Sequence, residues 1–324
     1  MARRTKPYVG IDLGGTNMQI GVVAPDNEII GRSRKKTLAD KGQDSIVTRI
    51  VEGVQQACEQ AGISVAQLGG LGIGAPGAID PAAGVVLEAV NLRWDDVPLA
   101  KILQTKLRVP VLVDNDVNVA VYGEWQAGAA RGDRELLGVW VGTGIGGGLV
   151  LNNSLYAGGF FTAGEIGHTI LYPNAPLARR SLEQNCSRTA IADRLAQLMR
   201  QNHKSVLMQL CEGNLSQIKS KMIAAAYAQG DKLTLEVLDE SAQLLGIAIA
   251  NVVTLLSIPK VVVGGGLTEA LGEAWVKKIR KAVRETAFPD RVQAVQVVAS
   301  QLEDDAGLLG AALLAREKLN GGKA

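Results

Sequence analysis

The chain has 324 residues, which is enough for two domains of about 150 residues each. Its 34 basic residues nearly balance its 32 acidic residues, and a net charge of +2 with interspersed charges argues against a nucleic-acid-binding protein. Apolar residues make up 47% of the chain, which is a globular composition. Its 38 glycines are about 12% of the 324 residues, more than the ordinary share of about 7%.

No targeting segment is predicted. The basic residues 1–7 are not followed by the apolar core of a signal peptide. The longest apolar stretch, residues 244–258, is interrupted by polar residues and is shorter than the ~20 residues of a membrane span, so it predicts a buried helix. The three cysteines have no C-x-x-C spacing, and together these features predict a cytoplasmic protein without disulfides.

The first third of the chain predicts strands that meet at glycine-rich turns. Strands are expected over residues 8–14, 18–24 and 27–36, followed by an amphipathic helix over 43–60. Further strands are expected over 68–77 and 109–116, the latter leading into a helix through Trp125.

The remaining chain begins with two strands that flank the glycine-rich residues 142–148 and then becomes mainly helical. The expected elements are helices over 182–201, 216–229 and 232–257, a strand over 258–266, a helix over 272–286, a strand over 292–298 and a helix over 304–319. The strand–glycine–strand pattern occurs twice, which predicts two copies of a βββαβα unit in an α/β fold. We expect a smaller lobe of residues 1–118 with the terminal helix 304–324, and a larger lobe of residues 119–303.

The first glycine turn spans residues 12–17, with the sequence DLGGTN. Gly14 and Gly15 allow backbone N–H groups to approach phosphate oxygens, and Thr16 adds a hydroxyl donor. Asp12, at the end of the strand, is placed to hold Mg²⁺ through water. The alternative is an ordinary hairpin turn.

The second glycine turn, GTGIGGG over residues 142–148, matches neither the dinucleotide fingerprint nor the P-loop, because a strand follows it and no Gly-Lys-Ser/Thr ends it. Five glycines in seven positions exceed what a hairpin needs. Two such turns in corresponding positions favour a clamp on an oligophosphate. A third turn, residues 264–266, is expected to pass under a base or ribose.

Asn115 and Asp116 stand at the end of a predicted strand. A carboxylate held there beside a polar cleft suits general-base catalysis on an alcohol. The alternative is that Asp116 caps the following helix, a role that does not exclude catalysis.

The segment Gly-Glu-Ile-Gly-His places Glu165 and His168 three residues apart, and Glu183 follows later. A carboxylate and an imidazole together are suited to bind sugar hydroxyls. A surface Glu–His pair without a function is the alternative, but the position after a glycine-rich turn favours the binding site.

Six segments of the chain resemble the ROK family, and within it the bacterial glucokinases: DLGGTN, GIGAPGAID, NLRW, DNDVNVAVYGEW, GTGIGGG and AGEIGH. The motifs follow the family's order from about Tyr8 to the last helix. The resemblance implies the actin/hexokinase-like (ribonuclease H-like) ATPase fold, with two lobes around a cleft and usually a homodimer. It also implies transfer of the γ-phosphoryl group of Mg-ATP to the 6-hydroxyl of a hexose.

The resemblance implies a role for each matching residue. Asp116 is the expected catalytic base. The expected sugar ligands are Asn115, Glu165, His168 and Glu183, with Gly77 and Asn91 lining the same pocket. The expected phosphate and Mg²⁺ site comprises Asp12, Gly14, Gly15, Thr16, Asn17, Thr143 and Gly144, and the expected adenosine site comprises Gly265 and Gly266.

The segment after His168 departs from the family, many of whose members have a cysteine-rich zinc motif there. Aligning Leu182 and Glu183 with the family places Ser181 where the last cysteine belongs, and Cys186 stands alone. One Cys and one His do not make the four-ligand set of structural Zn²⁺, so no zinc is expected. We expect residues 171–181 to be ordered by packing of Tyr172, Pro173, Pro176 and Leu177.

Two other classes of function agree less well with the sequence. ROK repressors carry a helix-turn-helix before the first strand, and the seven residues before Tyr8 are too few for one. A non-catalytic sugar-binding regulator would not need Asp116 and both glycine turns. Among kinases, the acceptor could also be fructose, mannose, N-acetylglucosamine or N-acetylmannosamine, and the donor polyphosphate, because epimeric sugars differ by a single hydroxyl.

Overall fold

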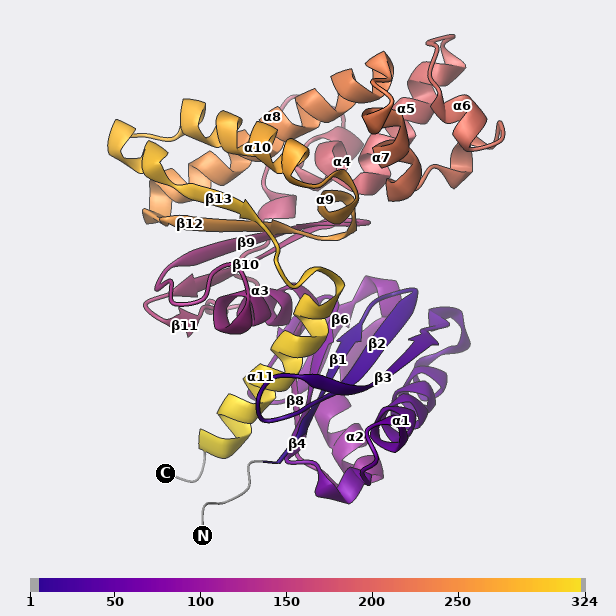
Figure 1. The fold of residues 1–324 in the computed structure, drawn as a ribbon, viewed down its shortest axis with the longest axis vertical. Coiled ribbons are helices and arrows are strands. Elements are labelled where there is room, and N and C mark those ends of the chain that lie inside the picture. The colour runs from indigo at the N-terminus through magenta and orange to yellow at the C-terminus, as the bar shows by residue number, and fades with distance from the viewer. Residues whose placement is uncertain (1–5, 322–324) are drawn as a thin grey trace. The chain divides into compact units, whose positions relative to one another are not determined.

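The computed structural model describes residues 6–321, which form two compact units (Figure 1). Unit 1 comprises residues 6–132, 155–163 and 304–321, and unit 2 comprises residues 133–154 and 164–303. The lobe boundary predicted near residue 118 stays a prediction.

Two five-stranded sheets share one topology. The first has the order β3-β2-β1-β4-β8 and the second the order β11-β10-β9-β12-β13. In both sheets the first strand of the copy pairs antiparallel with the second strand and parallel with the fourth. The repeated order confirms the predicted duplication of a βββαβα unit in an α/β fold.

The strands have the following bounds. Those of the first sheet are β1 (Tyr8–Leu13), β2 (Asn17–Val23), β3 (Ile29–Lys36), β4 (Gly70–Ala75) and β8 (Val111–Asn115). Those of the second are β9 (Leu136–Val141), β10 (Ile145–Leu151), β11 (Ser154–Leu155), β12 (Lys260–Gly264) and β13 (Gln296–Ala299).

In unit 1, helices α1 (Gln43–Gln60) and α11 (Ala306–Gly321) cover opposite faces of the first sheet. A Cβ on Gly21 would lie 2.8 Å from the Leu308 side chain of α11, whereas the neighbouring Ile20 lies against Gly53 of α1. Successive strand residues point to opposite faces, so the two helices are on opposite sides. A Cβ on Gly10 would lie 1.8 Å from the Leu308 carbonyl oxygen, so only glycine lets the backbone of α11 approach β1 so closely. The other helices of unit 1 are α2 (Leu99–Leu107) and α3 (Asp116–Ala127).

In unit 2, the 25-residue helix α8 (Lys232–Leu256) packs against α10 (Glu273–Thr286). Among the described residues, α8 is the one helix long and apolar enough to cross a membrane, but 56% of its apolar window is buried. It is a core helix, as the sequence predicts. The remaining helices of unit 2 are α4 (Glu183–Cys186), α5 (Arg188–Arg200), α6 (Leu207–Leu210), α7 (Ser220–Ala228) and α9 (Gly266–Leu271).

Three predicted elements are wrong in extent. The helix expected over 216–229 is the shorter α7, because residues 215–217 form a separate 3-10 helix. The helix expected over 182–201 is divided at Ser187, whose backbone is extended and whose hydroxyl accepts the N–H of Ala190 as the cap of α5. The strand expected over 292–298 is only β13, because residues 290–294 form a 3-10 helix. The ladder with β12 begins where Gln296 pairs with Lys260, directly after Pro259, whose nitrogen has no hydrogen to donate.

Helix α2 and a small antiparallel sheet of unit 1 have no counterpart among the predicted elements. This sheet comprises β5 (Ala78–Asp80), β6 (Val85–Ala89) and β7 (Trp94–Val97). Its strands have three to five residues, too few for a period to be recognised.

Candidate functional site

The first glycine turn joins β1 to β2 and is held by a residue that the sequence analysis did not identify. Thr37, directly after β3, is fully buried. Its hydroxyl donates to the Gly14 carbonyl at 2.6 Å, and its N–H donates to the Thr16 carbonyl at 2.8 Å. Within residues 6–321, no hydrogen bond engages the N–H groups of Gly15 and Thr16. Carbonyls tied back and N–H groups left available are features of an anion-binding turn.

Asp12 lies at the end of β1 in a cluster of carboxylates. Burial, followed by the charges of Asp116 and Asp304, raises its pKa to about 7. The first turn of α11 lies close beside it, because a Cβ on Gly307 would be 3.0 Å from Asp12 Cγ. A carboxyl whose ionised form is disfavoured by neighbouring carboxylates is a place where a cation would be stabilised. Asp304 is a further residue that the sequence analysis missed.

The chemistry of the carboxylates around Asp12 fits a magnesium ion. Among the described residues, no group of three or more His, Cys, Asp or Glu side chains is placed to bind a metal. Mg²⁺ does not need such a cage, because it usually binds one or two carboxylates, waters and substrate phosphates. Asp12, beside the first glycine turn, provides such a carboxylate.

Asn115 and Asp116 stand where β8 turns into α3, and their roles differ from the alternative considered for Asp116. The cap is Asn115, whose Oδ1 accepts the N–H groups of Val117 and Asn118 at 2.8 and 3.1 Å. Asp116 is the first residue of the helix, and its charge acts on Asp12. The cap interpretation of Asp116 is therefore wrong, and its carboxylate belongs to the cluster around Asp12.

A second buried carboxyl, Asp114, binds residues at the point where β8 turns into α3. Its Oδ1 accepts the Asn115 N–H at 2.7 Å and the Asn118 Nδ2 group at 3.0 Å. Burial raises the pKa of Asp114, although these hydrogen bonds and Lys318 lower it. Asp114 and Asn118 therefore fix the backbone that carries Asn115 and Asp116.

Two further predicted residues of unit 1 join these groups. Asn115 Nδ2 donates to the Gly77 carbonyl at 3.1 Å. Gly77 has a φ of 95°, and a Cβ there would lie 2.0 Å from the Glu88 carbonyl oxygen, so the position requires glycine. Asn91 lies against the first turn, since a Cβ on Gly15 would be 3.3 Å from Asn91 Cβ.

In unit 2, the second glycine turn is shorter than the sequence predicts. Strand β10 begins at Ile145, so only residues 142–144 form the turn, and Gly146, Gly147 and Gly148 belong to the strand. A Cβ on Gly147 would lie 2.3 Å from the Gly164 carbonyl oxygen, and one on Gly167 would lie 2.0 Å from the Ile145 carbonyl oxygen. Part of the glycine surplus therefore lets the segment with Glu165 and His168 lie flat on β10.

Glu183, at the start of α4, connects this turn to Glu165 and His168. Its Oε2 accepts the Ile145 N–H at 2.7 Å, and a Cβ on Gly144 would lie 2.3 Å from the same oxygen. Burial raises the pKa of Glu165, His168 lowers it and Glu183 raises it. His168 Nε2 is 3.9 Å from Glu165 Oε2. The three predicted sugar ligands of unit 2 therefore lie together.

The N-terminus of α5 holds the turn from its other side, through residues that sequence analysis missed. Thr189 donates its hydroxyl to the Thr143 carbonyl at 2.8 Å, and the Arg188 N–H donates to the Gly142 carbonyl at 2.9 Å. The Arg188 guanidinium donates to Thr143 Oγ1 at 3.2 Å. No glycine or repeat marks these positions in the sequence.

The third glycine turn lies at the end of β12. Gly265 has a φ of 87°, and a Cβ there would lie 2.8 Å from the backbone of Val141, which ends β9. Gly266 begins α9. The turn therefore lies against the strand that leads into residues 142–144.

The segment that replaces the zinc motif is ordered by hydrogen bonds. Ile170 and Ser181 form an antiparallel bridge, and Gln184 Oε1 accepts the N–H groups of Arg180 and Ser181 at 2.8 and 3.0 Å. Tyr172 and Leu177 are 41% and 77% exposed, so the prediction that they order the segment by packing is wrong. Burial raises the pKa of Cys186 to about 12.

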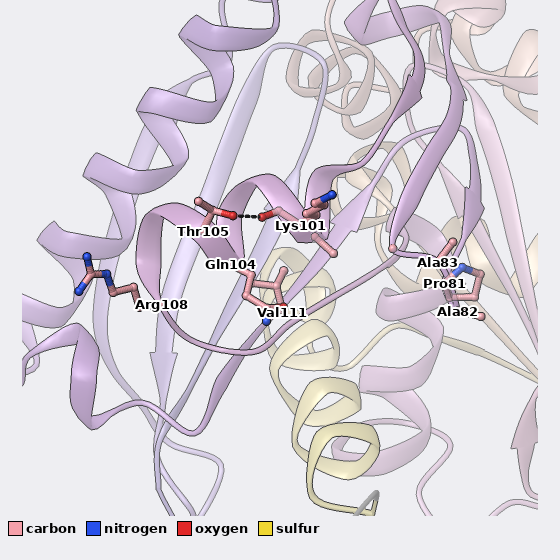
Figure 2. Close-up of a pocket in the computed structure, with 10 residues that line it drawn as sticks. Pro81, Ala82, Ala83, Lys101, Gln104, Thr105, Arg108 and Val111 are labelled. Atoms are coloured by element: carbon pink, nitrogen blue, oxygen red, sulfur yellow. Dashed lines mark hydrogen bonds between the residues drawn. The ribbon is translucent and has the colours of Figure 1, made fainter.

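A cavity of about 550 Å³ lies elsewhere in unit 1, between residues 81–84 and helix α2 (Figure 2). Lys101, Gln104, Thr105 and Arg108 line one side of it. None of the predicted site residues lines this cavity, so it does not belong to the candidate site.

Comparison with known proteins agrees with this arrangement. A glucokinase from Thermotoga maritima is 33% identical over 318 residues, covering 97% of this chain and 98% of the relative. The crystal structure of a ROK family glucokinase from Streptomyces griseus in complex with glucose and AMPPNP has a TM-score of 0.85 at 33% identity, covering 96% of this chain and 99% of that one. A xylose repressor from Caldicellulosiruptor bescii is 28% identical, covering 93% of this chain and 76% of the repressor.

The family model described as "ROK family" matches residues 8–318. This match extends from β1 into α11 and includes both glycine turns, β8, Asp116 at the start of α3, and the segment with Glu165 and His168. The chain therefore belongs to the ROK family and is similar to glucokinases over almost its whole length.

Proposed function

We propose that this protein is a glucokinase-type phosphotransferase, which moves the γ-phosphoryl group of Mg-ATP to the 6-hydroxyl of glucose. The observation that carries this proposal is the placement of Asp12 and Asp116 in one carboxylate cluster, with Asp12 leading into the first glycine turn. The similarity to a glucokinase whose structure contains glucose and AMPPNP supports the choice of both substrates.

Asp116 acts as the general base in this proposal. A sugar hydroxyl ionises only far above neutral pH, so a positioned carboxylate must accept its proton as the oxygen attacks phosphorus, which typically accelerates a reaction by ~10²–10⁴-fold. Asp114 and Asn115 fix the backbone on which Asp116 is carried. That rigidity keeps the base in one orientation toward the hydroxyl.

Sugar recognition is assigned to polar side chains. The proposed hydroxyl ligands are Glu165, His168 and Glu183, and also Asn91 and Asn115, with Gly77 beside Asn115. Carboxylate oxygens accept from sugar hydroxyls, and the Asn115 amide donates.

Phosphate binding is assigned to the glycine turns, through the N–H groups of Gly15, Thr16, Thr143 and Gly144, with Asn17 completing the first turn. Gly265 and Gly266 are assigned to adenosine. Asp12 would hold Mg²⁺ through water, and the ion would neutralise charge on the phosphates. We further propose that the protein is cytoplasmic and that it forms a homodimer. Light scattering measures the oligomeric state.

The experiment that tests the proposal replaces the base. Asp116→Asn keeps the shape of the side chain but not its ability to accept a proton, so kcat for glucose should fall at least ~100-fold while ATP still binds. Asp95→Asn, at an exposed aspartate of β7, is the matched control and should leave kcat unchanged. A near-normal kcat in Asp116→Asn would remove Asp116 from this role.

A further inference from the structure

The residues proposed so far for phosphate contacts offer backbone N–H groups, hydroxyls and amides, but no cation. The phosphate chain of a nucleoside triphosphate is strongly anionic, and a charged donor binds phosphate about twice as strongly as a neutral one. A cationic side chain at either turn would therefore contribute much of the affinity for the donor.

Arg188 places a guanidinium at the second turn. Its Nη2 lies 3.2 Å from Thr143 Oγ1, at the exposed tip of residues 142–144. In the part of the chain that the structure describes, no carboxylate forms an ion pair with Arg188, whereas Arg194 in the same helix is held by both carboxylate oxygens of Glu240 at 2.9 and 2.6 Å. The charge of Arg188 is thus available to a ligand.

The hydrogen bonds of the turn direct its remaining donors outward. The three carbonyls of residues 142–144 accept from Arg188 N–H, the Thr189 hydroxyl and Gly142 N–H. Within residues 6–321, no hydrogen bond engages the N–H groups of Thr143 and Gly144. Because Thr143 Oγ1 accepts from Arg188, its own hydrogen is free to donate. Two N–H groups, one hydroxyl and one guanidinium are therefore left at one short turn.

We propose that Arg188 is a donor-binding residue, whose guanidinium binds a phosphate oxygen of an oligophosphate at residues 142–144. This inference rests on the proposed function, because it assigns the turn to the phosphoryl donor. The side chain has two roles, since it orients the Thr143 hydroxyl and supplies the positive charge.

Substitution at position 188 isolates the guanidinium. The bond to the Gly142 carbonyl comes from the backbone N–H of Arg188, which any residue except proline retains. Arg188→Ala should therefore keep the turn folded, and the melting temperature of the ligand-free protein should be unchanged.

The test measures the affinities of inorganic tripolyphosphate, ATP and adenosine by titration calorimetry. Arg188→Ala should weaken tripolyphosphate and ATP about 10-fold each and change adenosine less than about twofold, because only the phosphates lose a charge-assisted hydrogen bond. Arg188→Lys should recover part of the loss, since a lysine keeps the charge but not the planar fork. Arg194→Ala should change none of the three.

Three results would overturn the inference. The first is an unchanged affinity for tripolyphosphate in Arg188→Ala, and the second is an equal loss for adenosine accompanied by a lower melting temperature, which would make Arg188 a scaffold residue. The third is a wild-type protein that binds no tripolyphosphate. If wild-type protein phosphorylates no hexose but binds tripolyphosphate, and Arg188→Ala binds tripolyphosphate more weakly, the proposed function fails and the inference stands. If glucose is phosphorylated equally well by wild-type protein and Arg188→Ala with unchanged ATP affinity, the inference alone fails.

Discussion

At Asp12, burial and two neighbouring carboxylates work against ionisation, and this electrostatic conflict is the most informative feature of the site at the residue scale. The structure of the ligand-free protein disfavours a negative charge at the position where the proposed reaction needs one. A bound cation would reverse the balance, because it stabilises the ionised carboxylate. The conflict is thus a cost that the proposed cation and phosphate site would impose on the ligand-free protein.

The stability of the ligand-free protein should reveal this cost. The pKa of Asp12 rises from 3.8 to about 7 on folding, so the folded protein keeps a proton there that the unfolded chain loses. Its stabilising contribution is complete below pH 3.8 and is lost as the pH rises through 7. The side chain of Asp12→Asn is always neutral. At about pH 8 the free energy of unfolding of this variant, measured with denaturant, should therefore exceed that of wild-type protein by at least about 1 kcal/mol. The difference should shrink towards pH 4, and a difference independent of pH would contradict the shifted pKa.

Glu165 and His168 should behave as ligands and not as scaffold. Their side chains are 43% and 71% exposed, so little packing is lost when they change. Glu165→Gln or His168→Ala should raise the KM for glucose about 10-fold, the effect of one lost hydrogen bond to a charged or polar group. The melting temperature without sugar should stay constant, and saturating glucose should raise it less than in wild-type protein. A melting temperature that falls in the sugar-free variants together with their affinity for glucose would indicate that Glu165 and His168 are a structural pair.

Helices and strands whose bounds depend on nearby residues are predicted well from apolar runs and hydrophobic periods. The strands around Asp12 and Asp116 follow from short apolar runs that end in glycine or polar residues, and α1 follows from its helical period. Ser187 could not be predicted to interrupt a helix, because its capping role depends on its extended backbone. The start of β13 depends on its pairing with the start of β12, where Gln296 lies opposite Lys260, and this is a long-range property.

In the candidate site, too, local features are predicted from the sequence and long-range contacts are not. Asp12, Asp116 and the glycine turns are recognisable because turn chemistry and strand ends are local features. Thr37 and Thr189 hold those turns from other parts of the chain, through a hydroxyl whose partner only the fold reveals. The glycines of β10 are also explained only by the segment that lies against them.

The hydrogen-bonded segment before Glu183 should be stable without metal. Gln184→Ala removes the acceptor of two N–H groups, so the free energy of unfolding should fall by about 1–2 kcal/mol, and the KM for glucose should rise because Glu183 adjoins the segment. Gln201→Ala, at the exposed end of α5, is the control. Elemental analysis should find far less than one zinc per chain, and chelation should leave the melting temperature unchanged. Stoichiometric zinc bound through His168 would contradict this account of the segment.

At the scale of the whole molecule, duplication extends from the sheets to the turns. Each copy of the unit joins its first two strands through a glycine turn, and in each copy a threonine hydroxyl holds a carbonyl of that turn. The threonine directly follows β3 in unit 1 and lies in α5 in unit 2. Each turn therefore leaves N–H groups without a hydrogen bond in the same way, although different elements support the two turns.

A coupled kinase assay over a panel of sugars directly measures the proposed phosphorylation of glucose with ATP as donor. The panel contains glucose, fructose, mannose, N-acetylglucosamine and N-acetylmannosamine, each with Mg-ATP or polyphosphate. We expect the highest kcat/KM for glucose with Mg-ATP, and loss of that activity in Asp116→Asn. No transfer to any sugar, or a higher kcat/KM for another sugar or with polyphosphate, would contradict it.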